Sequence, residues 1–472
     1  MIKRLLSFLN NLNTKQILFL LFLFNLFSKL LFVNHNDIAG DEPFTLFYAQ
    51  QEFSNILELL PKENNPPFHF IFLHFWIKIF GSSLFSIRLP SVIASALTAC
   101  VLFLIGKNIH SKSLGFFSAI AYSFSSFVIL HSHESRVYAI FVLFHCLSLL
   151  IILRKKTEFK HLFTFCLCNG ILLYSHFLSW ISLAIQSALI LYVFIGNWQK
   201  IKAFTFAIIA SIILYTPYLP LFLKRLNDSG NGTWVETPNA GKIYEIIRVF
   251  SNQPVVAVVV LLGVLTSLIL LFNHRKRKQA TVTSILFIAP YLGMFLISQK
   301  LAMFTDRYLL FCLPFLYLTS IFGLIEIIKS EKFRFILPSI LIVLLIATVD
   351  FKPSNKRNPS KIAELIKKEK GENSLMILSP PWIKLNLVYY LNKQAFKDYK
   401  DFDNYLIKHN IVPVIHISEL DKRFLLQQDH ILYLGGWDME NSGIELYLDQ
   451  NFDQKQEYPP FSGYRLIGFS KN

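Results

Sequence analysis

Charged residues are scarce in this chain of 472 residues. Asp, Glu, Lys and Arg together make up 16% of it, whereas a soluble globular chain carries roughly 25%. Hydrophobic residues make up 53%, and Phe alone occurs 47 times. A soluble fold of 54.7 kDa could not bury that much apolar surface, so much of it must face lipid. The composition therefore excludes a disordered chain, a collagen-like chain and a small disulfide-stapled secreted domain.

Cysteine is also scarce, with five residues in the whole chain. All five lie inside apolar runs: Cys100, Cys146, Cys166, Cys168 and Cys312. The Cys166–Cys168 spacing is too short for a zinc knuckle, and no second pair follows. We interpret the five thiols as small buried hydrophobic groups and expect no structural disulfide.

Acidic residues are few, and the formal net charge is +16. Residues 350–472 hold 17 Lys and Arg against 16 Asp and Glu, a net charge of +1, so +15 lies in the preceding residues. That excess lies in short clusters between apolar runs, which is typical of membrane topology rather than nucleic-acid binding. We predict a cytoplasmic N-terminus, an extracytoplasmic segment after residue 350 and no nucleic-acid partner.

Long apolar runs dominate what is present. A helix needs about 20 apolar residues to cross the hydrocarbon core, and eleven candidate spans occur, at 16–33, 89–106, 113–131, 137–153, 161–175, 177–196, 203–221, 255–272, 280–298, 308–325 and 335–349. The first span is long and lacks a small-residue cleavage site, so we expect it to be retained. The pattern indicates an integral protein of a bacterial-type inner or cell membrane.

Three segments outside these spans are predicted to be extracytoplasmic. Within the loop 34–88, residues 67–80 are apolar but too short to cross, which favours an interfacial or re-entrant helix. The segment 222–254 is polar, and we interpret its sequon 231–233 as a turn. Residues 350–472 resemble a soluble α/β domain, with strands expected at 374–378, 411–417, 431–434 and 464–469.

The predicted fold is thus a polytopic α-helical membrane protein with about eleven transmembrane helices and a C-terminal extracytoplasmic α/β domain. We place the transmembrane catalytic domain at 1–349, which includes the outer loop 34–88 and its juxtamembrane helices. The soluble domain then covers 350–472. No internal repeat is evident in the sequence.

Charge beside a membrane span is costly, so each such residue is a functional candidate. Asp41 and Glu42 follow the first span and are adjacent, which costs repulsion unless a cation is near. A partly desolvated carboxylate can act as a general base or bind a divalent metal. The alternative is an ordinary helix start, with acids favoured at the N-terminal dipole and Pro43 assisting. The spacing alone does not favour either interpretation.

A second charged cluster, 131–138, lies between the third and fourth spans. The forked guanidinium of Arg136 suits a phosphate, and Glu134 could ligate a metal or hold Arg136. The alternative is a Glu134–Arg136 pair that only satisfies itself. His131 and His133 alone are more often interfacial polar residues than metal ligands.

Further charged residues are predicted on the same membrane face. Arg88 stands at the start of a span, where the alternative role is an anchor that reaches lipid headgroups. Arg307 and Tyr308 open the tenth span, and His176 lies between the fifth and sixth, where a lone histidine is more often structural. Because the topology gathers these residues on one face, we predict a site there for a lipid-linked anion.

Four ordered stretches resemble the membrane glycosyltransferases of the GT-C fold, in the group of protein mannosyltransferases and lipid A aminoarabinose transferases. They are Gly40–Glu42, Asn65–Pro67 through Arg88–Ser91, His133–Tyr138 and Asp306–Tyr308. The similarity covers about residues 15–325. It implies a polyprenyl-phosphate-sugar donor and inversion at the anomeric carbon.

The resemblance also implies roles for individual residues. Asp41 would be the catalytic base, with Glu42 and Glu134 supporting it or binding a divalent metal cation. The arginines Arg88, Arg136 and Arg307 would hold the donor phosphate and stabilise it as leaving group. Tyr138 and Tyr308 would help to line the donor cavity, and we add His176 and Asn65 as candidate supporting residues of this cavity.

One residue departs from the family pattern. Relatives usually have His or Lys before the Pro-Pro pair, whereas this chain has Asn65. A neutral amide does not pair with phosphate as a cation does. The phosphate would therefore depend more on the arginines.

We expect an inverting glycosyltransferase that moves a sugar from the prenyl-phosphate donor to a lipid, glycan or protein acceptor outside the cytoplasm. A flippase or transporter of lipid-linked sugars is the alternative, although inverted repeats and mid-span charges typical of transporters are not evident. A non-catalytic membrane scaffold is the third hypothesis.

Overall fold

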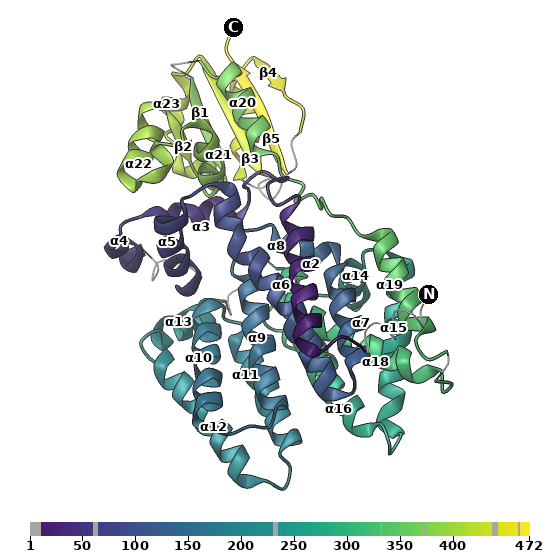
Figure 1. Cartoon of the computed structure of the whole chain (residues 1–472). Coiled ribbons are helices and arrows are strands. Elements are labelled where there is room, and N and C mark those ends of the chain that lie inside the picture. Colours follow the sequence, from purple (N-terminus) through teal and green to yellow (C-terminus); the bar gives the residue numbers. More distant parts are fainter. Residues whose placement is uncertain are drawn as a thin grey trace. The chain divides into compact units, whose positions relative to one another are not determined.

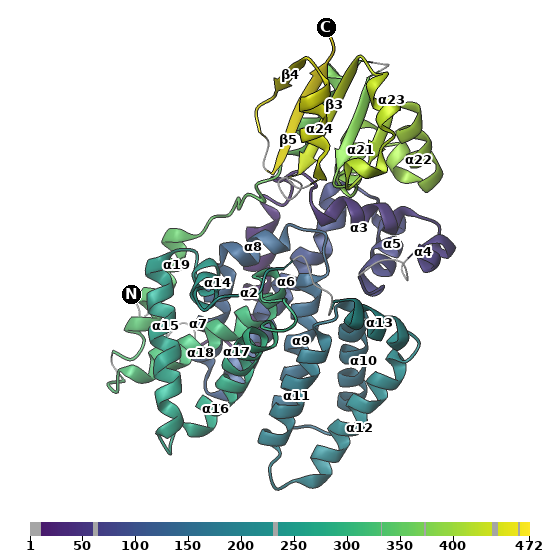
Figure 2. The same ribbon diagram turned by 180° about the vertical axis from the view of Figure 1, so that it is seen from behind.

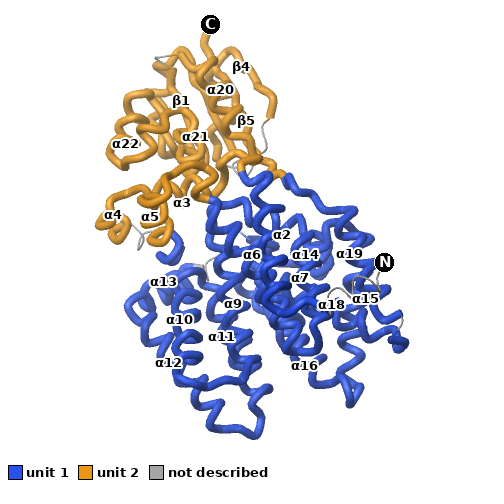
Figure 3. The backbone as a smooth tube through the Cα atoms, in the orientation of Figure 1, with its two compact units in different colours: residues 1–33, 59–69, 88–353 blue, residues 34–58, 70–87, 354–472 orange. Residues whose placement is uncertain are grey.

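The computed structural model describes residues 11–59, 65–229, 235–331, 333–371, 374–436, 442–460 and 463–472. The sequon 231–233, predicted as a turn, lies outside these residues. The chain forms two compact units (Figure 3). Unit 1 comprises residues 1–33, 59–69 and 88–353, and unit 2 comprises residues 34–58, 70–87 and 354–472.

Unit 1 is a bundle of helices (Figures 1 and 2). Its helices are α2 (Thr14–Leu30), α6 (Leu84–Ile109, whose first turn belongs to unit 2), α7 (Lys112–Ser123), α8 (Ser126–Ser132), α9 (Tyr138–Leu153), α10 (Phe159–Ser175), α11 (Ser179–Val193), α12 (Trp198–Tyr215), α13 (Leu219–Ser229), α14 (Gly241–Phe250), α15 (Pro254–Ile269), α16 (Arg277–Leu286), α17 (Ile288–Ile297), α18 (Leu313–Ile327) and α19 (Ile336–Thr348). Two 3₁₀ turns join them, η2 (Leu270–Phe272) and η3 (Arg307–Cys312).

Helices lie at all eleven predicted spans. Among the described residues, five are long and apolar enough to cross a membrane: Leu84–Ile109, Trp198–Tyr215, Pro254–Phe272, Arg277–Ile297 and Arg307–Ile327. A sixth is added if α7 and α8, bent by 66°, count as one broken span. These helices indicate an integral membrane protein, whereas the number of eleven crossings stays a prediction.

Helix α18 packs closely against α15 because two glycines face each other. A Cβ on Gly263 would overlap the backbone of Ser320, and one on Gly323 would overlap the carbonyl of Gly263. Small residues allow such backbone approach between membrane helices. The contact fixes α18, and thereby the η3 turn at its N-terminal end, which begins with Arg307.

Unit 2 combines the outer loop with the C-terminal domain. The loop contributes α3 (Asp41–Gln50), α4 (Phe53–Leu59, whose last residue belongs to unit 1) and α5 (Phe68–Phe80, whose first two residues belong to unit 1). The short apolar segment predicted at 67–80 is therefore a helix of 13 residues. The C-terminal domain contributes α20 (Pro359–Glu369), α21 (Ile383–Leu391), η4 (Ala395–Lys397), α22 (Tyr399–Lys408), η5 (Ile417–Glu419), α23 (Lys422–Leu426) and α24 (Ile444–Asn451).

The sheet of unit 2 has the order β2-β1-β3-β5-β4, with β1 parallel to β2 and β3 and with β5 antiparallel to β3 and β4. The strands are β1 (Leu375–Ser379), β2 (Ile411–Pro413), β3 (His430–Gly436), β4 (Gln454–Glu457) and β5 (Tyr464–Ser470). Strand β1 lies between β2 and β3 and is buried on both faces. The four predicted strands are present, and β2 is shorter than expected. The α/β character of this domain is confirmed.

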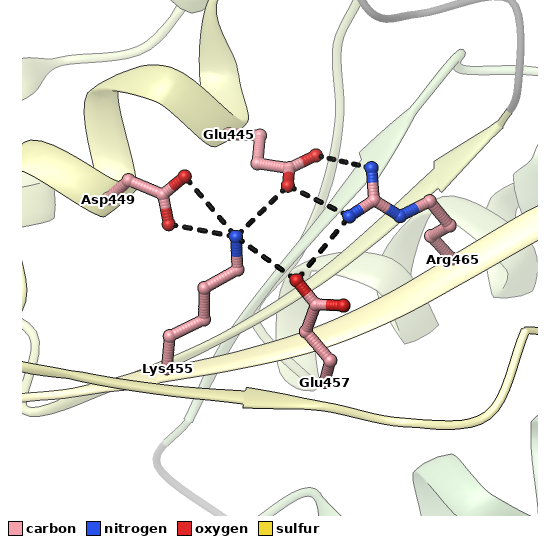
Figure 4. Close-up of polar contacts among 5 residues, drawn as sticks. All are labelled: Glu445, Asp449, Lys455, Glu457 and Arg465. Carbon is pink, nitrogen blue, oxygen red and sulfur yellow. Dashed lines mark hydrogen bonds and ion pairs between the residues drawn. The ribbon is translucent and has the colours of Figure 1, made fainter.

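Strand β4 was missed because its sequence, Gln-Lys-Gln-Glu, is polar and exposed throughout. Figure 4 shows how its Lys455 lies among three carboxylates, with distances of 3.2 Å to Glu445, 3.0 Å to Asp449 and 3.3 Å to Glu457. Arg465 of β5 contacts Glu445 at 3.1 Å. Charged side chains of this kind protect a sheet edge from pairing with another chain, while exposed ion pairs stabilise a fold little.

Segments 34–58 and 70–87 of the outer loop pack with the C-terminal domain in unit 2, rather than with the helices of unit 1. The functional division at 349/350 stays a prediction. All five cysteines are free, and four of them are buried.

Candidate functional site

The loop between α8 and α9 in unit 1 carries Arg136, and Tyr138 is the first residue of α9. The Arg136 guanidinium lies over the Tyr138 ring, 5.9 Å from its centroid. The Arg136 backbone is anchored from two sides, because its N–H donates to the Glu134 carbonyl at 2.9 Å and its carbonyl accepts from the Ser91 hydroxyl at 3.3 Å. Both side chains are over 90% buried. A cation held over an aromatic face in a buried position is suited to an anionic ligand.

The histidines of this loop hold its conformation. Glu134 pairs with His131, with 2.9 Å between Oε2 and Nδ1. The His133 Nε2–H donates to the Lys29 carbonyl on α2 at 2.7 Å, and its ring is 1% exposed. Both histidines are buried and hold the loop through these contacts, whereas we expected interfacial polar residues.

His176 contacts both the start of α9 and the turn η3. It directly follows α10, and its ring centroid lies 5.9 Å from that of Tyr138 and 5.3 Å from that of Tyr308. The Arg307 guanidinium in turn lies 5.6 Å from the centroid of the Tyr308 ring. Two arginines, two tyrosines and one histidine from three separate segments thus form one continuous group, which we call the cationic cluster (Arg136, Tyr138, His176, Arg307 and Tyr308).

The imidazole at the centre of the cationic cluster is neutral. Removal from water, followed by the charges of Arg136 and Arg307, lowers the pKa of His176 to about 3. Its Nδ1 accepts a hydrogen bond from the Leu178 N–H at 3.1 Å. The remaining proton therefore belongs to Nε2, which can donate one hydrogen bond to an anionic oxygen.

His69 is a neighbour of this cluster that the sequence analysis did not select. It lies in the first turn of α5, its side chain is 4% exposed, and burial, followed by the charge of Arg136, lowers its pKa to about 4. Its position shortly after Pro66 and Pro67 was the available signal. Since it is neutral, it does not replace the cation that Asn65 lacks.

Arg88 and Asn65 occupy other places in unit 1. Arg88 is completely buried, and its Nη1 donates to the Val33 carbonyl at 2.8 Å. Burial inside the protein argues against the alternative of a headgroup anchor. The Asn65 carbonyl accepts a hydrogen bond from the Tyr218 hydroxyl at 3.4 Å. The phosphate role of Arg88 and the supporting role of Asn65 stay predictions.

Asp41 and Glu42 open α3 in unit 2. The residue before them, Gly40, has φ 63° and ψ −118°, a conformation that is essentially restricted to glycine. Glu42 is 2% exposed, whereas Asp41 is partly exposed. A helix therefore does begin at Asp41, as in the alternative interpretation, and Asp41 is the more accessible of the two carboxylates.

The C-terminal domain holds the backbone that leads to Asp41. Asn386 donates to the Gly40 carbonyl at 3.2 Å, and Tyr390 donates to the Ile38 carbonyl at 3.1 Å. On the side of α20, the Ser360 N–H donates to Asp37 Oδ2 at 3.0 Å. The loop preceding α3 is therefore fixed by residues far away in the sequence.

Arg357 is a second residue that the sequence analysis missed. Its guanidinium lies directly against Gly40, where a Cβ would overlap Nη1. The pKa of Tyr464 is raised, mainly by burial. The Arg357 charge opposes this shift and the Asp41 charge adds to it, so both charged groups lie near the phenol. No local motif marks Arg357, because its neighbours on the loop come from the opposite end of the chain.

The structure thus brings five of the predicted residues together in the cationic cluster. The two acids lie in the other unit, and their meeting with the cluster stays a prediction. Within the described part of the chain, no group of three or more His, Cys, Asp or Glu side chains is placed to hold a metal ion. The metal roles of Glu42 and Glu134 therefore also stay predictions.

One family model matches part of the chain. Residues 64–220 match the family model of dolichyl-phosphate-mannose-protein mannosyltransferases. This stretch contains Arg88, the loop 131–138 and His176, but neither Asp41 nor Arg307. No curated protein matches the chain significantly.

Solved structures match over almost the whole chain. The crystal structure of ArnT from Cupriavidus metallidurans bound to undecaprenyl phosphate superposes with a TM-score of 0.57, at 9% identity, over 96% of this chain and 97% of that chain. The archaeal oligosaccharyltransferase AglB from Archaeoglobus fulgidus, in complex with an inhibitory peptide and a dolichol-phosphate, gives 0.51 at 8% identity over 96% and 74%. The expected resemblance is therefore confirmed: the chain has the GT-C fold of these glycosyltransferases and carries a segment of the protein-mannosyltransferase type.

Proposed function

We propose that the protein is a membrane glycosyltransferase that transfers a sugar from a polyprenyl-phosphate donor to a hydroxyl of a lipid, glycan or protein acceptor. The reaction takes place on the extracytoplasmic face and inverts the anomeric carbon. The GT-C fold and the family match support glycosyl transfer, and ArnT and AglB were solved with prenyl phosphates.

The cationic cluster carries this proposal. Each guanidinium lies over a tyrosine ring, and both tyrosine rings contact a neutral imidazole that can donate a hydrogen bond. An arginine fork matches the oxygens of a phosphate, and aromatic rings suit the apolar prenyl chain and the sugar. A donor that joins a phosphate to a lipid and a sugar fits both properties.

Asp41 is the base in the proposed mechanism. Its carboxylate takes the proton of the acceptor hydroxyl, the hydroxyl oxygen attacks C1 of the sugar, and the bond from C1 to the phosphate oxygen breaks on the opposite side. General-base catalysis of this kind contributes about 10²–10⁴-fold. Arg357, which lies against Gly40, helps to keep the turn that presents Asp41 in place.

The arginines of the cationic cluster stabilise the leaving group. The prenyl phosphate gains negative charge as the C1–oxygen bond breaks, and fixed donors near that oxygen lower the barrier without reorganisation. Arg136 and Arg307 supply positive charge, and the Nε2–H of His176 supplies a neutral hydrogen bond. A divalent cation would add positive charge at the same phosphate. Since the described residues show no group of ligands for one, no step depends on it here.

A transfer assay tests the proposal. Purified protein is incubated with a panel of radiolabelled prenyl-phosphate sugars and a membrane lipid extract, and mass spectrometry identifies the product. We expect protein-dependent transfer of one sugar. Movement of label across liposomes without any transfer would instead establish the flippase, and the absence of both would support the scaffold.

A further inference from the structure

Unit 2 contains a half-open cavity of about 520 Å³. Binding sites for small ligands usually have volumes of roughly 300–1,000 Å³. Its walls come from the loop 34–38, from α3, from residues 82–84 at the start of α6 and from residues 389–397, which run from the end of α21 through η4. It is thus built on the same loop that precedes Asp41.

The lining of the cavity combines apolar and polar side chains. Leu46 and Phe396 line it and are each 1% exposed, and Tyr389 adds an aromatic ring. Asn34, Gln50 and the serines 82 and 83 contribute amide and hydroxyl groups. Aromatic surface surrounded by groups that both donate and accept hydrogen bonds suits a carbohydrate, which presents C–H faces and hydroxyls.

The lining also carries positive charge. Lys393 and Lys397 are exposed and line the cavity, and the Lys393 ammonium lies 5.4 Å from the centroid of the Tyr389 ring. Neither ammonium forms an ion pair with a carboxylate of the described residues. The single acid of the lining, Asp37, already accepts a hydrogen bond from the Ser360 N–H. The lining therefore favours an anionic ligand.

We propose that this cavity binds a phosphate-bearing sugar of the acceptor, with the sugar against Tyr389 and the phosphate between Lys393 and Lys397. The identification of the ligand as the acceptor rests on the proposed function. The binding of a phosphate-bearing sugar to the cavity does not depend on it. Two residues of the lining adjoin apolar segments that are predicted to cross the membrane, because Asn34 follows the first predicted span and Leu84 begins α6. This position favours a lipid-linked acceptor.

Hydrogen exchange of the full-length chain in phosphatidylcholine nanodiscs tests the binding. The probes are glucose 1-phosphate, glucose and inorganic phosphate. We expect glucose 1-phosphate to protect 34–38 and 389–397 more strongly than either other probe. Equal protection by inorganic phosphate, or no protection by any probe, would overturn the inference. Protection by phosphatidylglycerol nanodiscs without any probe would also overturn it, since bulk anionic lipid would then be the ligand.

Matched lysine variants sharpen the test. The double variant Lys393→Ala/Lys397→Ala should bind glucose 1-phosphate no better than glucose, and its acceptor KM should rise on the order of tenfold with an unchanged donor KM. The control Lys400→Ala/Lys408→Ala, on exposed positions of α22, should behave as the wild type. Probe binding without any transfer would contradict only the proposed function. Normal acceptor kinetics without probe binding would contradict only this cavity.

Discussion

The two units hold their candidate residues in different ways. In unit 1 the side chains themselves make the site, since Arg136, His176 and Arg307 come from three segments and meet through ring contacts. In unit 2 the backbone makes it, because hydrogen bonds and the Arg357 guanidinium fix the turn before Asp41. The difference suits a division of work, in which unit 1 holds an anion and unit 2 presents one carboxylate.

The largest expected effect concerns the anion in unit 1. The double variant Arg136→Ala/Arg307→Ala should weaken donor binding by about 100-fold or more, since each charge-assisted hydrogen bond contributes about 1.5–3 kcal/mol. Binding of a radiolabelled prenyl-phosphate sugar measures this. Arg154→Ala/Arg275→Ala, on predicted cytoplasmic loops, is the control. Unchanged donor affinity in the cluster variant would remove the phosphate role.

The next effect concerns the turn in unit 2. Gly40→Ala should destabilise the protein by about 1–3 kcal/mol through its backbone conformation, and it should also displace Arg357. Gly81→Ala is a matched control, because Gly81 has φ 76° but nothing within 4 Å of an added Cβ. The unfolding temperature should fall further for Gly40→Ala than for Gly81→Ala. Equal losses would show that the Arg357 contact contributes nothing.

A smaller effect is expected for Arg357 itself. Arg357→Gln should lower kcat on the order of tenfold without changing the donor KM, because a misplaced base loses its alignment with the acceptor. Arg357→Lys should recover part of the rate. Lys356→Gln, the exposed neighbouring cation, serves as control. A raised donor KM in Arg357→Gln would instead assign this arginine to the phosphate.

The smallest effect is a pH dependence of stability in unit 1. The pKa of His176 is about 3 in the folded chain and about 6.5 in an unfolded one, so the unfolded state binds the extra proton between these values. Stability should therefore be full above about pH 6.5 and should fall as the pH decreases towards 3. Unfolding temperatures from pH 7 to 4.5 should decrease less for His176→Gln than for the wild type or the exposed-site control His35→Gln. Identical slopes would contradict a neutral buried imidazole.

The sequence predicted the helices because apolar runs are a local property, and it predicted most of the sheet from short apolar strands. It missed β4, which is a polar edge strand without an apolar face. The cationic cluster was predicted from topology, since alternating loops place residues of distant segments on one face. Arg357 and the cavity around Tyr389 were not predicted, because they depend on packing between the outer loop and the C-terminal domain, which no local pattern records.

The most direct test of this division of work is to measure donor binding and turnover together in Asp41→Asn, with Asp401→Asn on α22 as the control. The account predicts that Asp41→Asn binds the prenyl-phosphate sugar with wild-type affinity and transfers it at least about 100-fold more slowly. Loss of donor binding in step with turnover would contradict the account, because Asp41 would then belong to the donor site rather than act as the base.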